Sequence, residues 1–100
     1  MTPENSIEIA RNPGPEFRSV RLGIEPGGAI VMDAQDMGPT VKRVWDTDDY
    51  EFWVRVEPDA VSKLAFELLK DKFAGELGAV DALRAYCRER GVACEFGSWV

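Results

Sequence analysis

Residues 49–57, with the sequence DYEFWVRVE, constrain the fold of this chain more than any other segment does. Every second side chain is apolar, namely Tyr50, Phe52, Val54 and Val56. Strict alternation is typical of a strand that has one face on a core and the other in water. Trp53 departs from the pattern, because it is a large apolar side chain on the face that carries Glu51 and Arg55. The segment therefore predicts a half-buried strand with an aromatic side chain on its wet face.

Three shorter strand patterns precede this segment. The first lies around residues 7–9, and the second covers Phe17–Ile24, with alternating apolar side chains. The Glu-Pro-Gly-Gly run at residues 25–28 is a strong turn signal, since proline fixes one φ and glycine accepts a positive φ. The return strand of a hairpin is expected at residues 29–32. These strands predict a mainly antiparallel sheet.

The second half of the chain carries helical patterns. Pro39 opens a short helix over residues 39–45, where its missing N–H needs no partner. Longer amphipathic patterns predict helices over residues 58–73 and 79–90, with Leu64, Leu68 and Leu83 in the core. A closing strand with Phe96 in the core is expected at residues 92–96, after a glycine that ends the last helix. The fold class is therefore predicted as α+β: four to five strands covered on one face by two C-terminal helices.

Length and composition bound the class of protein. A chain of 100 residues with 45% hydrophobic residues is expected to form a single domain over residues 1–100. No apolar run approaches the roughly 20 residues that span a bilayer. The first residues lack the basic and apolar regions of a secretory signal. We therefore expect a cytoplasmic protein that does not bind membranes.

Cys87 and Cys94 are the only cysteines, and the chain has no histidine. One lies on a predicted helix and the other on the strand that follows, so the two thiols are expected to be close. Without a secretory signal, two reduced and buried thiols are favoured over a disulfide. No CxxC pair is present, so a zinc site is poorly supported, and we expect no metal and no cofactor.

The net charge of −6 is unevenly distributed along the chain. Residues 1–60 carry twelve acidic and six basic side chains, and residues 33–59 alone carry eight and three. No basic stripe is available to neutralise phosphates, which argues against nucleic acid as a partner. A basic protein is favoured as the partner. The alternative is that the acidity only keeps a small domain in solution.

Two candidate sites fall in and before the alternating strand. The candidate protein interface consists of Trp53, Glu51, Arg55, Asp48 and Asp49. Tryptophan is enriched at the energetic centres of interfaces, because it offers a large area and a polar N–H. The structural alternative is that Trp53 packs beneath the closing segment, against Trp99. The second candidate is the acidic region Asp46–Glu51, whose carboxylates would suit a hard cation or acid–base chemistry, although it lacks the spacing of an EF-hand loop.

Residues 34–56, AQDMGPTVKRVWDTDDYEFWVRV, resemble a pattern in small uncharacterised bacterial α+β proteins. In that pattern a QDxG element precedes a short helix, an aromatic residue, an acidic turn and a strand that begins DYE-aromatic. Ala34 stands where the pattern has glycine. The size and acidity of the chain also resemble, in type, those of immunity proteins of bacterial toxin systems.

Together these features predict a non-enzymatic, cytoplasmic protein-binding domain. One form of that function is immunity-type inhibition of a basic protein. The chain has no histidine and no nucleotide-binding or serine-nucleophile motif, which argues against an enzyme. The alternative is a small metal-dependent or carboxylate-based enzyme that uses the region Asp46–Glu51.

Overall fold

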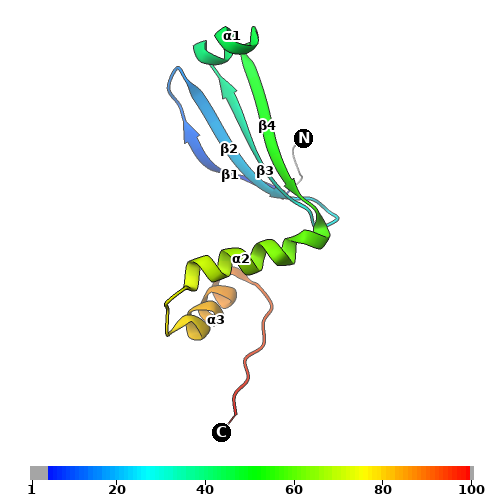
Figure 1. The fold of residues 1–100 in the computed structure, drawn as a ribbon, viewed down its shortest axis with the longest axis vertical. Helices are drawn as coiled ribbons and strands as arrows, with labels where there is room; N and C mark the ends of the chain where they lie inside the picture. The colour runs from blue at the N-terminus through cyan, green and yellow to red at the C-terminus, as the bar shows by residue number, and fades with distance from the viewer. Residues whose placement is uncertain (1–4, 100) are drawn as a thin grey trace. The chain divides into compact units, whose positions relative to one another are not determined.

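The computed structural model describes residues 5–99 and has the predicted α+β class (Figure 1). Its elements follow one another as β1 (Asn5–Asn12), β2 (Phe17–Ile24), β3 (Ile30–Met37), α1 (Pro39–Trp45), β4 (Asp49–Val56), the 3₁₀ helix η1 (Pro58–Ala60), α2 (Val61–Phe73) and α3 (Ala79–Arg90). The chain forms two compact units, one up to Leu64 and one from Ala65 onward. Coverage of one face of the sheet by the two C-terminal helices stays a prediction, as does the single domain over residues 1–100.

The first unit is built on one sheet with the strand order β1-β2-β3-β4, in which all neighbours are antiparallel (Figure 1). Strand β3 is longer than its four-residue apolar pattern predicted, because it pairs along its whole length with β2 and β4. The predicted turn joins β2 to β3. Gly28 has a φ of 97°, and its N–H donates to the Glu25 carbonyl over 2.8 Å. Strand β1 also extends beyond its pattern, and it contains a bulge between Glu8 and Ala10.

The register sorts the side chains of this sheet onto two faces, because neighbours directly opposite each other share a face. The face that we call the apolar face carries Ile7, Ala10, Val20, Leu22, Ile24, Ile30, Met32, Ala34, Phe52, Val54 and Val56. The face that we call the polar face carries Ser6, Glu8, Arg11, Ser19, Arg21, Asp33, Gln35, Glu51, Trp53 and Arg55. The alternation in β4 is therefore confirmed.

Within the sheet unit taken by itself, the apolar face of β4 is partly exposed, so the prediction that it lies on a core depends on what covers this face. Phe52 is 39% exposed and Val54 is 67% exposed, whereas Val31 and Asp33 on the polar face are 1% and 8% exposed. The register explains this result. Asp33 lies between the long side chains of Arg21 and Trp53 on neighbouring strands. Long side chains cover short neighbours with their apolar stems and rings, even on a charged face.

Helix α1 lies at one end of the sheet and matches its predicted bounds (Figure 1). Pro39 is in its first turn, and Asp46 ends it with a φ of 56°. The Glu16 carboxylate accepts hydrogen bonds from the Thr40 N–H and hydroxyl, over 3.1 and 2.9 Å. Gly38 precedes the helix with a φ of 129°, and a Cβ built there would overlap the Pro15 carbonyl oxygen. These contacts tie the loop between β1 and β2 to the start of the helix.

The second unit holds the rest of α2 and all of α3. Gly91, with a φ of 69°, ends α3 as predicted, and the Val92 N–H donates to the Cys87 carbonyl over 2.8 Å. The predicted strand at residues 92–96 is wrong, because this segment has no regular structure. Phe96 instead lies against the Arg84 guanidinium, 4.1 Å from the ring centroid. A side-chain contact to α3 thus replaces strand pairing, and it leaves Phe96, predicted as core, largely exposed.

Two other predicted core residues of the helical segment, Leu68 and Leu83, are also exposed, since a pair of short helices encloses little volume. The cysteines are both free thiols. Burial raises the pKa of the Cys87 thiol, and a hydrogen bond with Cys94 raises it further, which confirms that the two are neighbours. Cys94 is exposed, so the prediction that both cysteines are buried is wrong for that residue.

Within residues 5–99, none of the helices has the length and the apolar character that crossing a bilayer requires.

The environment of Gly38 gives a direct test of the fold. Replacing Gly38 with alanine should lower the free energy of unfolding by at least about 2 kcal/mol, because a positive φ and a backbone overlap would both penalise the Cβ. Gly27→Ala is the matched control, since a Cβ there meets no atom within 4 Å. Urea denaturation measures both variants. Equal midpoints for the two would contradict this description of the loop.

Candidate protein interface on strand β4

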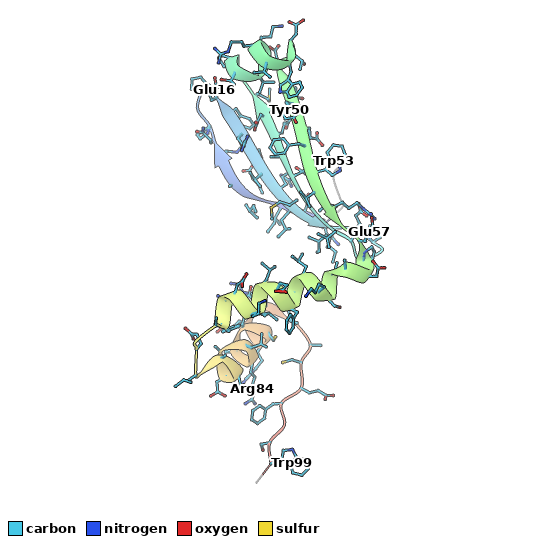
Figure 2. All side chains as sticks on the ribbon, viewed as in Figure 1. Glu16, Tyr50, Trp53, Glu57, Arg84 and Trp99 are labelled. Atoms are coloured by element: carbon cyan, nitrogen blue, oxygen red, sulfur yellow. The ribbon has the colours of Figure 1, made fainter. Side chains whose placement is uncertain are left out.

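Strand β4 is one of the two edges of the sheet, and it carries most of the residues of the candidate interface. Glu51, Trp53 and Arg55 all lie on the polar face, together with Asp49 at the start of the strand. Asp48 lies in the turn between α1 and β4. Trp53 is 52% exposed and stands out from the strand (Figure 2). The structure therefore brings Asp49, Glu51, Trp53 and Arg55 together along one face of an edge strand.

Arg55 is held by two carboxylates of its own chain. Its Nε and Nη2 donate to Glu25 Oε1 over 3.0 and 2.9 Å, and its Nη1 donates to Glu57 Oε1 over 2.6 Å. These bonds raise the pKa of Arg55, and they lower the pKa of Glu25. Arg55 thus serves first to fasten the end of β4 to the turn between β2 and β3.

The acidic side chains before β4 have separate positions. Asp49 accepts two hydrogen bonds from the Gln35 amide on β3, each over 3.0 Å. Asp46 terminates α1 through its backbone, whose N–H donates to the Lys42 carbonyl over 2.9 Å. Among residues 5–99, no group of three or more acidic or cysteine side chains has a geometry that would hold a metal ion.

The other aromatic residues of this region belong to the opposite face. Trp45 of α1 stacks on Tyr50, with ring centroids 4.8 Å apart and planes at 14°. Tyr50 in turn stacks on Phe52 at 5.3 Å, and the Arg18 guanidinium lies 5.3 Å from the Phe52 ring. This stack fixes α1 to the end of the apolar face. Trp53 is therefore separated from Trp45 and Tyr50, although the three are close in sequence.

Trp99, the expected cover of Trp53 in the structural alternative, belongs to the helical unit, so a contact between the two stays a prediction. Within the sheet unit, Trp53 has Asp33 as its direct neighbour on β3. Within the sheet unit about half of the Trp53 surface is exposed and available for contact.

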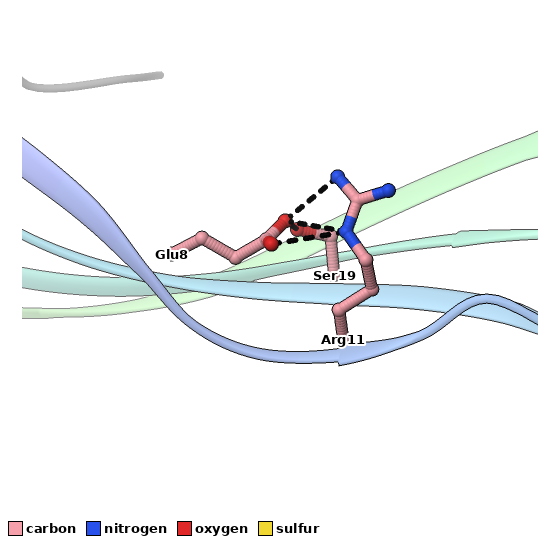
Figure 3. A network of polar contacts seen from close by, with 3 residues as sticks. All are labelled: Glu8, Arg11 and Ser19. Atoms are coloured by element: carbon pink, nitrogen blue, oxygen red, sulfur yellow. Dashed lines mark hydrogen bonds and ion pairs between the residues drawn. The ribbon is translucent and has the colours of Figure 1, made fainter.

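Sequence reasoning missed a polar network at the other edge of the same face, around Glu8, Arg11 and Ser19 (Figure 3). Arg11 Nε and Nη2 each donate to the Glu8 carboxylate over 2.9 Å, and the Ser19 hydroxyl donates to it over 2.5 Å. Residues three apart lie on opposite faces of a regular strand. The bulge in β1 is what brings Glu8 and Arg11 to one face, and no turn residue in the sequence marks it.

A second missed feature is a hollow of about 400 Å³ at the α1 end of the sheet. Its acidic residues are Glu16 and Asp36. Arg18 holds Asp36 through two hydrogen bonds of 2.5 and 2.6 Å, and this contact lowers the pKa of Asp36. Glu16 is held on Thr40. Both carboxylates therefore serve to join the elements around the hollow.

The chain matches no protein-family model, and comparison with curated proteins and with solved structures also finds no match.

The Glu8 network predicts a specific dependence of stability on pH. Arg11 and then Ser19 lower the pKa of Glu8 from 4.5 to about 2. A carboxyl whose pKa is lower in the folded state stabilises the protein at pH values above its unfolded pKa. That contribution should be lost as the pH falls from about 4.5 to about 2. Glu8→Gln should therefore be less stable than the wild type at neutral pH, and its free energy of unfolding should decrease less than that of the wild type as the pH is lowered.

NMR titration of Glu8 measures this effect directly. Arg11→Gln removes the charged hydrogen-bond donor that lowers the Glu8 pKa most, so the Glu8 pKa should rise toward the value of a free glutamate. A wild-type Glu8 that titrates near 4.5 would refute the network.

Proposed function

We propose that this protein is a non-enzymatic binding domain whose contact surface is the polar face of β4, with Trp53 at its centre and a basic protein as its partner. The observation that carries the proposal is the half-exposed Trp53 on an edge strand among acidic side chains. A large aromatic ring in this position loses little side-chain freedom on association, since it has few rotatable bonds.

The local charge supports a basic partner. Asp48, Asp49, Glu51 and Glu57 lie in or beside β4, whereas Arg55 is the only base in this strand. Its charge is already balanced by the carboxylates of Glu25 and Glu57. The surface around Trp53 is thus negative overall. Such a surface would accelerate association with a positively charged protein and would fix the orientation of the complex.

Immunity-type inhibition is the specific form of this function that we propose, and it is supported by the resemblance in size and acidity. A cytoplasmic location belongs to the same proposal. The enzymatic alternative requires carboxylates that converge on one point. Asp49 is bound to Gln35 and Asp46 ends a helix, so the geometry favours binding over catalysis.

The proposal predicts the behaviour of Trp53→Ala. Peptides selected for binding to the protein from a random display library should be rich in lysine and arginine. The Trp53→Ala variant should bind the best of them more weakly by about 2 kcal/mol or more, as truncation of an interface tryptophan does. Its free energy of unfolding should fall by at most about 2 kcal/mol, because half of the ring is already exposed. Calorimetric titration and urea denaturation give the two values.

Trp45→Ala is the matched control. It removes the same residue type from the stack on Tyr50, so it should cost about 0.5–1.5 kcal/mol of stability and leave peptide affinity unchanged. Equal affinity of Trp53→Ala and the wild type would overturn the proposed surface. A loss of about 3–5 kcal/mol of stability in Trp53→Ala would instead place this side chain in a core.

A further inference from the structure

The two edges of the sheet differ in how they are protected against pairing with another strand. Edge strands commonly avoid such pairing through bulges, prolines, lysines or short length. Strand β1 has a bulge between Glu8 and Ala10. Strand β4 pairs with β3 through eight consecutive residues without a shift in register, and it contains neither proline nor lysine. Of the two, β4 is therefore the edge suited to accept a further strand.

The sequence of β4 is complementary to itself. Glu51 and Arg55 are the charged residues between Tyr50 and Val56, and each lies two positions from Trp53. If a second copy pairs antiparallel about a two-fold axis at Trp53, Glu51 of each copy lies opposite Arg55 of the other. Opposite charges in directly opposite positions stabilise a strand pair.

The apolar positions of the strand agree with the same register, whereas Asp49 at its start would lie opposite Glu57 just beyond its end, where two acids face each other. Phe52 would lie opposite Val54 of the other copy, and Tyr50 would lie opposite Val56, which gives aromatic–aliphatic pairs on the apolar face. Trp53 would meet its own counterpart on the polar face. The Arg55 guanidinium is already ordered by its ion pairs with Glu25 and Glu57, so little side-chain freedom is lost when it meets a further carboxylate.

We propose that β4 is a homodimer interface, in which two copies join their four-stranded sheets into one continuous antiparallel sheet centred on Trp53. The contact is isologous, because each copy contributes the same strand. Such a dimer would bring two Trp53 side chains and two sets of acidic residues onto one surface.

Sedimentation equilibrium of the full chain, from micromolar to near-millimolar concentration, tests the proposal. The wild type should reach twice the monomer mass. Glu51→Lys places a base opposite Arg55 twice per dimer, so it should raise the dissociation constant at least about tenfold. Glu89→Lys makes the same change of charge on α3, and it should dimerise like the wild type. A wild type that stays monomeric throughout, or a Glu51→Lys variant that dimerises normally, would overturn the proposal.

A mixing experiment provides a second readout that does not depend on one variant. Arg55→Glu alone should also dimerise more weakly than the wild type, because two acids would then face each other. Mixed in equal amounts, Glu51→Lys and Arg55→Glu should form a heterodimer, since each altered position then faces an opposite charge. Circular dichroism checks that both variants are folded. Two folded variants that fail to associate on mixing would contradict the pairing.

Cross-linking tests the register. In a background with Cys87→Ser and Cys94→Ser, Trp53→Cys should cross-link to its counterpart when oxidised with copper phenanthroline. Efficient cross-linking of Phe52→Cys instead would show a register centred on Phe52 and would overturn the one proposed. If the protein is monomeric and binds peptides through Trp53, the dimer proposal is wrong and the proposed function stands. If the protein dimerises and binds no basic peptide, the dimer proposal stands and the proposed function is wrong.

Discussion

The register between β3 and β4 is the constraint on which the rest of the sheet unit depends. It places Trp53 opposite Asp33 and Phe52 opposite Ala34, and it thereby decides which side chains share a face. A shift by one residue would move every side chain of β4 to the other face. At one end of β4 the register is held by Arg55, which binds Glu25 in the turn between β2 and β3. At the other end it is held by Asp49, which binds Gln35 of β3. Two polar contacts thus frame the edge strand that carries the candidate interface.

The same arrangement explains why the polar face is the better candidate for binding. Its ion pairs are mostly internal to the sheet, as the contacts of Glu8 with Arg11 and Ser19 show. These contacts fix the charged side chains in place without burying the ring of Trp53. The aromatic residues that might have competed for this role, Trp45 and Tyr50, are used to attach α1 to the sheet. One tryptophan is therefore left on a rigid, negatively charged edge.

Much of this unit follows from local sequence rules. Strict alternation predicted β4 and the faces of its side chains, and the turn residues at 25–28 predicted the hairpin of β2 and β3. Helix α1 was predicted from Pro39 and helix α3 from its apolar spacing and Gly91. The failures share one physical cause, which is that burial and pairing depend on neighbours distant in sequence. Asp33 is buried because Arg21 and Trp53 flank it, and residues 92–96 alternate without having a strand to pair with. The network of Glu8 depends on a bulge that only the pairing with β2 reveals.

The most direct test of this account is the accessibility of Trp53 in a variant that keeps it as the single tryptophan, made with Trp45→Phe and Trp99→Phe. Quenching of its fluorescence by acrylamide reports how much of the indole meets solvent. The account predicts efficient quenching in dilute solution, and progressive protection as the concentration rises and the β4 edges pair. A Trp53 that is shielded from acrylamide even in the most dilute samples would contradict it, because the side chain would then belong to a core rather than to a surface.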